Sequence, residues 1–304
     1  MRTQAESKET RPCVEGISIV IPAYNEEEGV GEVIDQILAA MVQVDLPHEI
    51  VVVDDGSQDR TAEIVAGKPV RLLRHGTNRG YGAALKTGIA ASAYRHVAIV
   101  DGDGTYEPAD LVKLVQSMAD SDMVVGARTG KGARIPLLRR PAKWFLTRLA
   151  NYLTDTKIPD LNSGFRIFDK EVAERFFPIL PSNFSFTTTL TMAMLTSGYS
   201  VAFLPTRYGK RKGKSKIRPV RDTINFLSLV LRTALYFAPL KIFLRLSVFL
   251  IALSLFKMIV IDILLIQNMT DSTLLLLLAG IQVGMLGLLA DLIDKRSPPM
   301  GGKR

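Results

Sequence analysis

The segment "HVAIVDGDGTYEP" (residues 96–108) places a short apolar run directly before two aspartates that one glycine separates. A nearly continuous apolar run is typical of a strand that is buried on both faces of a parallel sheet. Asp101 and Asp103 follow where this strand ends, and two carboxylates this close together are costly to desolvate unless a cation lies between them. The segment therefore predicts a buried strand that ends at a cation site.

The same alternation of apolar strand and polar turn recurs through the first half of the chain. Short β-branched runs predict five strands, at residues 17–22, 49–55, 70–73, 97–101 and 122–127. Helical patterns lie between them, at residues 27–41, 62–65, 81–92 and 108–118. Strand and helix in alternation predict an α/β domain with a mostly parallel, doubly wound sheet. Residues 140–240 are less regular, and "DLNSGFRIF" (160–168) is interpreted as a loop.

Four polar motifs follow predicted strands. Ligands of doubly wound sheets bind beyond the carboxyl ends of the strands, so we expect these motifs to form one site. They are "PAYNEEE" (22–28), "DDGSQDRT" (54–61), "DGDGTYEP" (101–108) and "ARTGKGAR" (127–134).

Each motif, taken alone, also has a purely structural interpretation. Asp101 and Asp103 fit a Mg²⁺ site that clamps a diphosphate, because Mg²⁺ is held by one or two carboxylates plus substrate phosphates, but an exposed acidic turn has the same pattern. Asp54 and Asp55 fit acceptors for a nucleobase N–H or a ribose hydroxyl, while the turn after them fits a helix cap. "NRGYGAALKTG" (78–88) brings a glycine-rich turn into a helix, which suits phosphate binding, but it lacks the third glycine of the dinucleotide fingerprint.

The composition favours a cytosolic domain with a membrane or phosphate partner. Lys and Arg outnumber Asp and Glu by 38 to 30, and such an excess suits nucleic acid, a membrane surface or a phosphorylated substrate. Cys13 is the only cysteine, so we expect no intrachain disulfide and a reducing compartment. Residues 1–16 are polar and lack the apolar core of a secretory signal peptide. Residues 207–221 hold eight basic residues and no acidic one and, alone, are equally well interpreted as a solvated loop.

The last part of the chain predicts a membrane hairpin. Residues 272–290 contain no charge and are numerous enough to cross a bilayer. An earlier apolar segment, residues 242–266, is interrupted by Lys257 and Asp262, which are costly in lipid unless they face another helix or a partner chain. We therefore expect two transmembrane helices, at about 242–266 and 272–293, and a homo-oligomer through these helices is one way to pair the two charges. A buried helix pair in a soluble core is the alternative.

Basic residues flank both ends of this hairpin, whereas the turn "QNMTD" inside it has none. By the positive-inside rule, this distribution predicts an integral membrane protein whose termini and α/β domain all lie in the cytoplasm. The flanking residues are Lys241, Arg245, Lys295, Arg296, Lys303 and Arg304.

Seven motifs in this order resemble those of family 2 glycosyltransferases, in particular the branch of the dolichyl-phosphate mannose synthases and polyprenyl-phosphate glycosyltransferases. The motifs are "SIVIPAYNEEEGV" (18–30), "VVVDDGSQDRT" (51–61), "NRGYGAAL" (78–85), "VDGDGTYEP" (100–108), "VGAR" (125–128), "DLNSGFRIF" (160–168) and "KRKGKSKIRPVRDT" (210–223). The resemblance covers roughly residues 17–240, and the two C-terminal membrane segments also match bacterial and archaeal members of that branch.

The resemblance implies a GT-A fold and an inverting, Mg²⁺- or Mn²⁺-dependent transfer of a monosaccharide. The donor would be a nucleotide sugar, GDP-mannose or a UDP-hexose, and the acceptor a polyprenyl phosphate, either dolichyl or undecaprenyl. The product would be a lipid-phosphate sugar donor for glycan or glycoprotein assembly. A lipid monophosphate is already largely ionised at neutral pH, since its second pKa is about 6, so it needs positive charge and orientation more than a strong base.

Carried over position by position, the resemblance also implies roles for individual residues. Nucleotide binding falls to Pro22, Tyr24, Glu26, Asp54, Asp55 and Asp101. Asp101 and Asp103 become the metal ligands, with Asp103 the more direct, and Thr105 stands where many relatives carry a glutamine. Acceptor phosphate binding falls to Arg128, Arg140, Arg211 and Lys216, with Lys143 as an alternative to Arg140. Catalysis falls to Asp103, Arg128 and Asp160, where Asp160 is a base, an orienting group or a structural residue.

These interpretations divide the chain into five segments. They are a polar tail (1–16), a GT-A domain (17–218), a juxtamembrane amphipathic helical region (219–241), two membrane helices (242–294) and a cytoplasmic tail (295–304). A membrane polysaccharide synthase of the same fold is an alternative, but its Q-x-x-R-W motif is absent around Trp144. A non-catalytic membrane scaffold is a second alternative. Nucleic-acid binding through the basic run would leave the metal motif and the membrane segments unexplained, so no nucleic-acid partner is expected.

Overall fold

The computed structural model describes residues 14–129, 147–148, 150–154, 156–182, 185–209, 239–266 and 268–296. The chain divides into two compact units, residues 1–218 with 301–304 and residues 219–300. Eight residues named above lie outside the described residues, and so does most of the predicted juxtamembrane region. They are Cys13, Arg140, Lys143, Trp144, Arg211, Lys216, Lys303 and Arg304.

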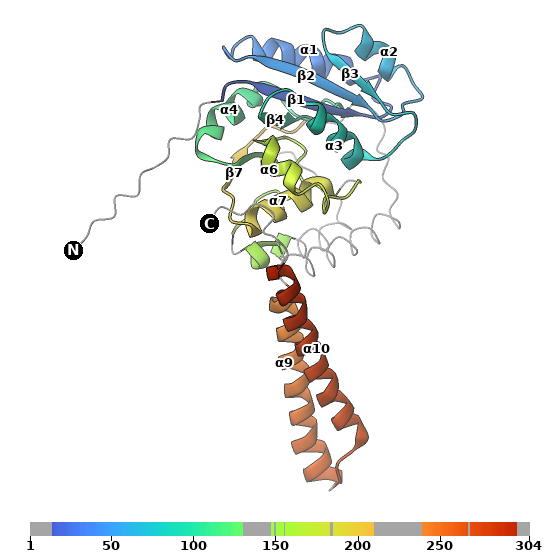
Figure 1. Ribbon diagram of the computed structural model, residues 1–304, viewed down its shortest axis with the longest axis vertical. Helices are drawn as coiled ribbons and strands as arrows, with labels where there is room; N and C mark the ends of the chain where they lie inside the picture. The colour runs from blue at the N-terminus through green and yellow to red at the C-terminus, as the bar shows by residue number, and fades with distance from the viewer. Residues whose placement is uncertain are drawn as a thin grey trace, which may run out of the picture. The chain divides into compact units, whose positions relative to one another are not determined.

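The first unit is built on a seven-stranded sheet with the strand order β3-β2-β1-β4-β6-β5-β7 (Figure 1). Neighbouring strands are parallel except for the two pairs that β6 makes, with β4 and with β5, which are antiparallel. The strands are β1 (Ile17–Ala23), β2 (His48–Asp54), β3 (Arg71–Arg74), β4 (His96–Ile99), β5 (Met123–Ala127), β6 (Arg166–Asp169) and β7 (Val201–Pro205). The five strands predicted from apolar runs are all present. The interpretation of residues 160–168 as a loop was wrong for its last three residues, which belong to β6.

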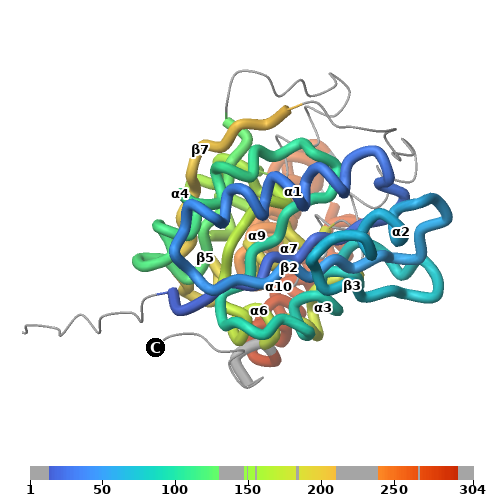
Figure 2. The backbone as a smooth tube through the Cα atoms, turned by 90° about the horizontal axis from the view of Figure 1, so that it is seen from above, coloured from blue at the N-terminus to red at the C-terminus, as the bar shows by residue number. Residues whose placement is uncertain are grey.

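Helices cover both faces of this sheet, which confirms the doubly wound arrangement. Residues of α1, α2 and α4 share one hydrophobic core with the side chains of Ile17, Ile19 and Ile21 from β1, and Figure 2 looks onto the face that α1 covers. On the opposite face, Val51 and Val53 of β2 pack with a residue of α3. The helices are α1 (Val30–Met41), α2 (Thr61–Ala66), α3 (Tyr81–Ala91), α4 (Asp110–Ser117), the 3₁₀ turn η1 (Met118–Asp120), α6 (Lys170–Arg175) and α7 (Phe186–Thr196).

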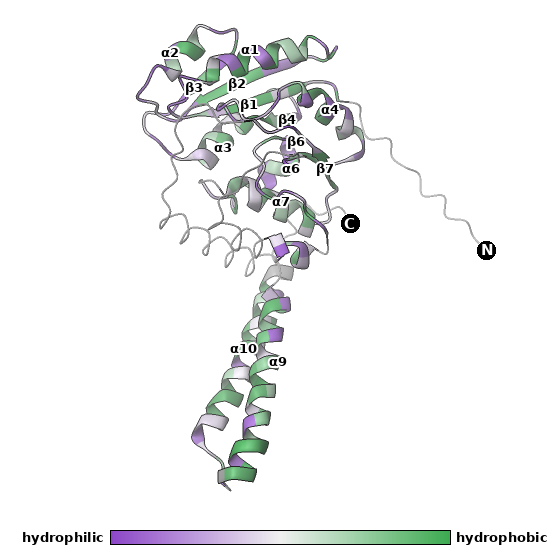
Figure 3. Ribbon diagram, turned by 180° about the vertical axis from the view of Figure 1, so that it is seen from behind, coloured by the Kyte–Doolittle hydropathy of each residue, from purple (hydrophilic) through white to green (hydrophobic). Residues whose placement is uncertain are grey.

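The second unit is a hairpin of two apolar helices (Figure 3). It consists of α9 (Pro239–Lys257), the π-helical segment η3 (Met258–Ile266) and α10 (Asp271–Arg296). Residues Pro239–Leu265 and Asp271–Ile293 are long and apolar enough to cross a membrane, with mean hydropathies of 2.6 and 2.2. Only 11% and 17% of the two spans are buried within the protein. Their apolar side chains therefore face outward, as in a membrane hairpin and unlike the buried helix pair of a soluble core.

Small residues let the two helices of the hairpin approach closely, a common feature of helix pairs in membranes. A Cβ atom on Gly280 would lie 2.7 Å from Ile251, and one on Gly284 would lie 2.8 Å from the hydroxyl of Ser247. The Ser247 hydroxyl also donates to the carbonyl oxygen of Gly280 at 2.7 Å. The seam thus combines close backbone contact with an interhelical hydrogen bond.

The two charges within the predicted first span pair with each other inside the hairpin. Lys257 Nζ lies 3.0 Å from Asp262 Oδ1, and Asp262 also accepts from the hydroxyls of Thr270 and Thr273. Since Asp262 is fully buried, these contacts supply the partner that its charge requires. An oligomer is not needed to pair these charges, and the predicted homo-oligomer stays a prediction.

Candidate active site

The site lies at the edge of the sheet where β1, β2 and β4 end. The turns after β1 and β2 are joined by side chains that bond to the backbone. The amide of Asn25 donates to Ser57 Oγ at 2.9 Å, and the amide of Glu26 donates to Thr61 Oγ1 at 2.8 Å. Pro22 stands in β1 opposite Val53 of β2. The predicted nucleotide-binding residues of the first motif are therefore held beside the second motif.

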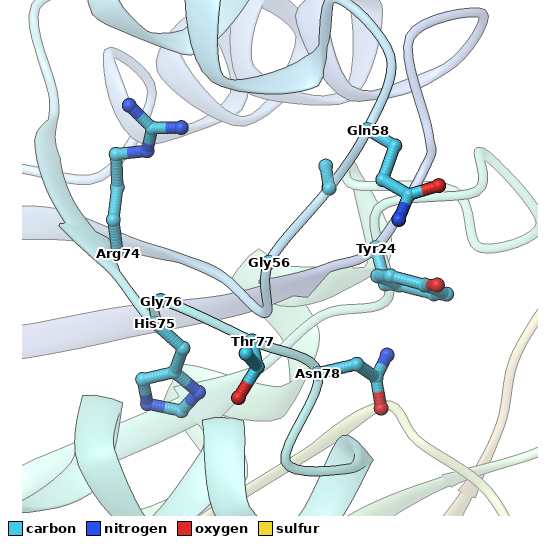
Figure 4. A pocket seen from close by; sticks show the side chains of 9 residues that line it. Tyr24, Gly56, Gln58, Arg74, His75, Gly76, Thr77 and Asn78 are labelled. Carbon is cyan, nitrogen blue, oxygen red and sulfur yellow. The ribbon is translucent and has the colours of Figure 1, made fainter.

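A cavity of about 470 Å³ opens between these turns and the segment after β3 (Figure 4). This volume lies in the range of small-molecule binding sites. Gly56, at φ +74°, lets the two loops meet, because a Cβ there would lie 2.7 Å from the backbone of Thr77. The lining residues are Tyr24, Gly56, Ser57, Gln58, Arg74, His75, Gly76, Thr77 and Asn78. Of the six residues predicted to bind the nucleotide, only Tyr24 lines this cavity.

Asp54 and Asp55 both hold neighbouring loops in place. Asp54 is fully buried; its Oδ1 accepts from the amide of Ser57 at 3.0 Å and its Oδ2 from Arg74 Nε at 3.3 Å. Asp55 is 3% exposed and bonds to His75 Nδ1 at 2.6 Å. It also accepts from the backbone amides of residues 79 and 80, at 2.9 and 2.8 Å. A contact of either carboxylate with a nucleobase stays a prediction.

Asp101 and Asp103 lie just beyond β4, each with a hydroxyl donor. The Tyr81 hydroxyl donates to Asp101 Oδ1 at 2.8 Å. Asp103 Oδ1 accepts from the Thr105 hydroxyl at 2.6 Å and from its amide at 3.1 Å. The backbone of Gly164 lies so close to Asp101 that a Cβ there would stand 2.7 Å from its Cγ. Thr105 therefore orients a carboxylate in this structure.

These two carboxylates suit a divalent cation that is shared with a substrate. Among the described residues, no group of three or more His, Cys, Asp or Glu is placed to hold a metal ion. Mg²⁺ is commonly bound by one or two carboxylates, with substrate phosphates and water completing the octahedron. Asp101 and Asp103 fit that donor set, and the missing side chain of Gly164 leaves room for the first of them.

Arg128 and Asp160 form a two-pronged ion pair at the same edge of the sheet, in which Asp160 is buried and Arg128 is part-buried. Arg128 Nε and Nη2 donate to the two carboxylate oxygens of Asp160 at 2.6 and 2.9 Å. The guanidinium also lies over the ring of Tyr208, 5.3 Å from its centroid. Burial acts to lower the pKa of Arg128, but the hydrogen bonds and charge of Asp160 outweigh it and raise that pKa. The structure thus brings together two of the three residues predicted to act in catalysis.

A second arginine lies buried behind the site. Arg166 in β6 is fully buried, and it donates to the carbonyl oxygens of Ser163 and Thr187 and to the hydroxyl of Thr191. Burial lowers the pKa of Arg166 to about 10, and its acidic neighbours act in the opposite direction. Its positive charge offsets part of the negative charge at this end of the sheet.

Sequence analysis missed several residues that shape the site. Tyr81 lies inside a motif that was quoted for its glycines, Arg166 lies in the segment interpreted as a loop, and His75 follows β3 without any motif of its own. Two features of the sequence could have identified such residues. Tyr81 directly follows a glycine turn, and Arg166 lies inside an otherwise apolar run. Tyr106, in the acidic turn itself, accepts from the amide of Gly164 at 2.9 Å, and its ring meets that of Tyr208 edge to face at 5.3 Å.

Comparison with known proteins agrees with this geometry. The model of glycosyl transferase family 2 matches residues 18–177, slightly more than half of the chain. A second model, the GtrB C-terminal hairpin, matches residues 238–295.

Two curated relatives and one crystal structure illustrate the similarity. A dolichyl-phosphate hexose transferase of Haloferax volcanii is 30% identical, over 69% of this chain and 90% of that protein. A polyprenol monophosphomannose synthase of Mycolicibacterium smegmatis is 28% identical, over 66% of this chain and 80% of its own. The glucosyl-3-phosphoglycerate synthase of Mycobacterium tuberculosis, crystallised with Mn²⁺, UDP and glucosyl-3-phosphoglycerate, superposes with a TM-score of 0.56 at 24% identity. That alignment covers 73% of this chain and 79% of the synthase.

The sheet order, the acidic turn after β4 and the matched segments confirm the α/β fold of the GT-A type and the predicted class of enzyme. The chain belongs to glycosyl transferase family 2 and is a glycosyltransferase with a C-terminal hairpin of the GtrB type.

Proposed function

We propose that this enzyme transfers one sugar from a nucleotide sugar to a polyprenyl phosphate, with inversion at the sugar and with the help of Mg²⁺ or Mn²⁺. The names of the two curated relatives support this acceptor class. The observation that carries the proposal is the position of the Arg128–Asp160 pair at the same sheet edge as Asp101 and Asp103. This edge of the sheet then offers two carboxylates for a cation on the donor diphosphate and a guanidinium, held by Asp160, for the phosphate of the acceptor.

The donor binds across the ends of β1, β2 and β4. Its nucleoside occupies the cavity beside Tyr24, and its diphosphate extends toward Asp101 and Asp103. A bound divalent metal would neutralise negative charge on the leaving nucleoside diphosphate. The hydroxyl of Thr105 keeps Asp103 oriented toward that position.

The acceptor is a nucleophile that needs positioning more than it needs a base, because its phosphate is largely dianionic above a second pKa of about 6. Arg128 binds this phosphate through the fork geometry that guanidinium groups provide. Asp160 acts as the orienting group, since both of its oxygens already accept from Arg128. A phosphate oxygen attacks the anomeric carbon, the bond from that carbon to the diphosphate breaks, and its electron pair leaves with the nucleoside diphosphate.

The membrane hairpin holds the enzyme where its lipid substrate is found. Basic residues at both ends of the hairpin support an orientation with the termini and the catalytic unit in the cytoplasm. The basic run at 207–221 supports attraction to anionic lipid headgroups.

The test is a transfer assay with the full chain purified in detergent. Polyprenyl phosphate and Mn²⁺ are mixed with radiolabelled GDP- and UDP-sugars in turn, and label in the organic phase is counted. We expect label from one donor, and its loss in Asp103→Asn. The matched control is Asp35→Asn, which removes an exposed carboxylate that pairs with Lys68 at 2.7 Å. Absence of label from every donor, or full activity of Asp103→Asn, would overturn the proposal.

A further inference from the structure

The first residue of α3 contacts the acidic turn after β4. The Tyr81 hydroxyl donates a hydrogen bond to Asp101 Oδ1 at 2.8 Å, across twenty residues of sequence. The hydroxyl therefore joins the start of α3 to the turn that carries Asp101.

The position of Tyr81 is fixed by the turn before it. Asp55 accepts from the backbone amides of Arg79 and Gly80, at 2.9 and 2.8 Å, and Gly80 adopts φ +100°. Asp55 is held in turn by His75, whose other ring nitrogen lies 3.0 Å from the hydroxyl of Thr87. The ring of Tyr81 therefore starts from a backbone that a buried carboxylate already holds in place.

Asp101 is confined from a second side by the backbone of Gly164. A Cβ there would lie 2.7 Å from Cγ and 2.8 Å from Oδ1 of Asp101, so the carboxylate packs directly on main-chain atoms. The amide of Gly164 is itself held by the hydroxyl of Tyr106 at 2.9 Å. A hydroxyl donor and a backbone wall together restrict rotation of the Asp101 carboxylate.

We infer that Tyr81 is a positioning residue, whose hydroxyl holds Asp101 in the orientation in which this carboxylate binds the divalent cation. The inference rests on the proposed function, because it gives Asp101 the role of a metal ligand. Carboxylates that bind metals are themselves hydrogen-bonded in proteins, and loss of such a bond typically costs 10- to 100-fold in metal affinity or activity. Removal of the hydroxyl is therefore expected to weaken cation binding about 10-fold.

The test compares Tyr81→Phe with the wild-type full chain in detergent. Mn²⁺ is titrated into each protein with UDP and, separately, with GDP, without acceptor lipid, and free Mn²⁺ is counted from its electron paramagnetic resonance signal. We expect a Mn²⁺ dissociation constant about 10-fold higher in Tyr81→Phe. We also expect a higher Mn²⁺ concentration for half-maximal transfer, with the rate recovering at saturating Mn²⁺. A melting curve establishes that the variant is folded.

The matched control is Tyr199→Phe. Tyr199 is also buried in the catalytic unit, but its hydroxyl contacts Arg175 at 3.5 Å and its ring packs edge to face on Phe176. This variant is expected to bind Mn²⁺ as the wild type does.

The outcomes separate this inference from the proposed function. A Mn²⁺ affinity in Tyr81→Phe equal to that of the wild type overturns the inference, even if sugar transfer proceeds. A weakened Mn²⁺ affinity in a protein that transfers no sugar to any lipid phosphate supports the inference and overturns the proposed function.

Discussion

Replacement of Gly164 by alanine is expected to reduce activity about 100-fold in a protein that still folds. The new Cβ would lie 2.7 Å from Cγ of Asp101, whereas ordinary contacts begin at 3.4 Å. Asp101 must therefore move by at least ~0.7 Å, which strains its 2.8 Å hydrogen bond from Tyr81. A misplacement of about 1 Å at a reacting centre can cost about 100-fold in rate, which corresponds to about 2.7 kcal/mol in the activation barrier.

The substitution should also lower the stability of the fold, without unfolding the protein. Overpacking of a filled interior typically costs about 1 to 3 kcal/mol, and each kcal/mol lowers the melting temperature of a domain of this size by about 2–4 °C. We therefore expect a folded protein with a slightly lower melting temperature and kcat/KM reduced about 100-fold.

The assay measures initial rates of label transfer to polyprenyl phosphate, and thermal unfolding of the same samples. Gly67→Ala is the matched control, because the nearest atom to a Cβ there lies at 3.5 Å, an ordinary contact. A Gly164→Ala enzyme that keeps its rate within about threefold of the wild type, well short of the 100-fold expected, would refute the claim that this glycine makes room for Asp101.

Three further predictions concern charged groups. Asp160→Asn leaves the part-buried Arg128 guanidinium without its ion-pair partner, so unfolding in urea should show a loss of stability smaller than the about 3 to 5 kcal/mol of a fully buried pair. Arg128→Met/Asp160→Asn should recover part of that loss, and equal stability of the wild type and both variants would contradict the prediction. Hydrogen bonds lower the pKa of Asp59 below 3.8 despite its partial burial, which acts in the opposite direction. Because that folded-state pKa is depressed, its stabilisation is present above pH 3.8 and is lost as the pH falls through the folded value. Asp59→Asn should therefore destabilise the protein at pH 7 and have no effect once the carboxyl group is protonated in both the folded and the unfolded protein. Melting curves recorded at a series of pH values from 7 down to 3 measure this change. Lys257→Met removes the ion-pair partner of the buried Asp262 and should lower the melting temperature in detergent. Lys257→Met/Asp262→Asn should restore most of that melting temperature. A double variant as unstable as the single one would show that the ion pair does not stabilise the hairpin.

The central strands and the location of the site could be predicted because both follow from simple patterns. A strand buried on both faces is apolar through its centre, and residues 19–22 and 50–53 carry that pattern without interruption. Once these strands are parallel, the polar turns after them must meet at one edge. The prediction of residues 97–101 as a strand ran two residues too far, because β4 ends at Ile99 and leaves Asp101 in the turn.

The parts that could not be predicted depend on contacts between distant residues. The residues of β6 were interpreted as part of a loop, and Arg166 interrupts their apolar run. The arginine is nevertheless fully buried, because carbonyl and hydroxyl oxygens around it accept its N–H groups. The residues next to Asp55 in the sequence do not indicate that His75 and the amides of residues 79 and 80, all after β3, will surround its carboxylate. Neither environment exists until the sheet has formed.

The reversed direction of β6 explains how its motif reaches the site. Parallel strands contribute the residues that follow their carboxyl ends, and β4 and β5 both do so. In the antiparallel ladders, Arg166 at the start of β6 pairs with Ile99 of β4 and with Val125 of β5. The segment that precedes β6, rather than the one that follows it, therefore lies between the ends of its two neighbours.

This placement accounts for both contributions of "DLNSGFRIF". Gly164 lies against Asp101, which follows β4, and Asp160 lies against Arg128, which follows β5. Because one segment touches both neighbouring turns, it fixes the proposed cation ligand and the proposed phosphate-binding guanidinium relative to each other. A parallel strand at this position would direct the segment to the opposite edge of the sheet, and neither Asp101 nor Arg128 would have these partners.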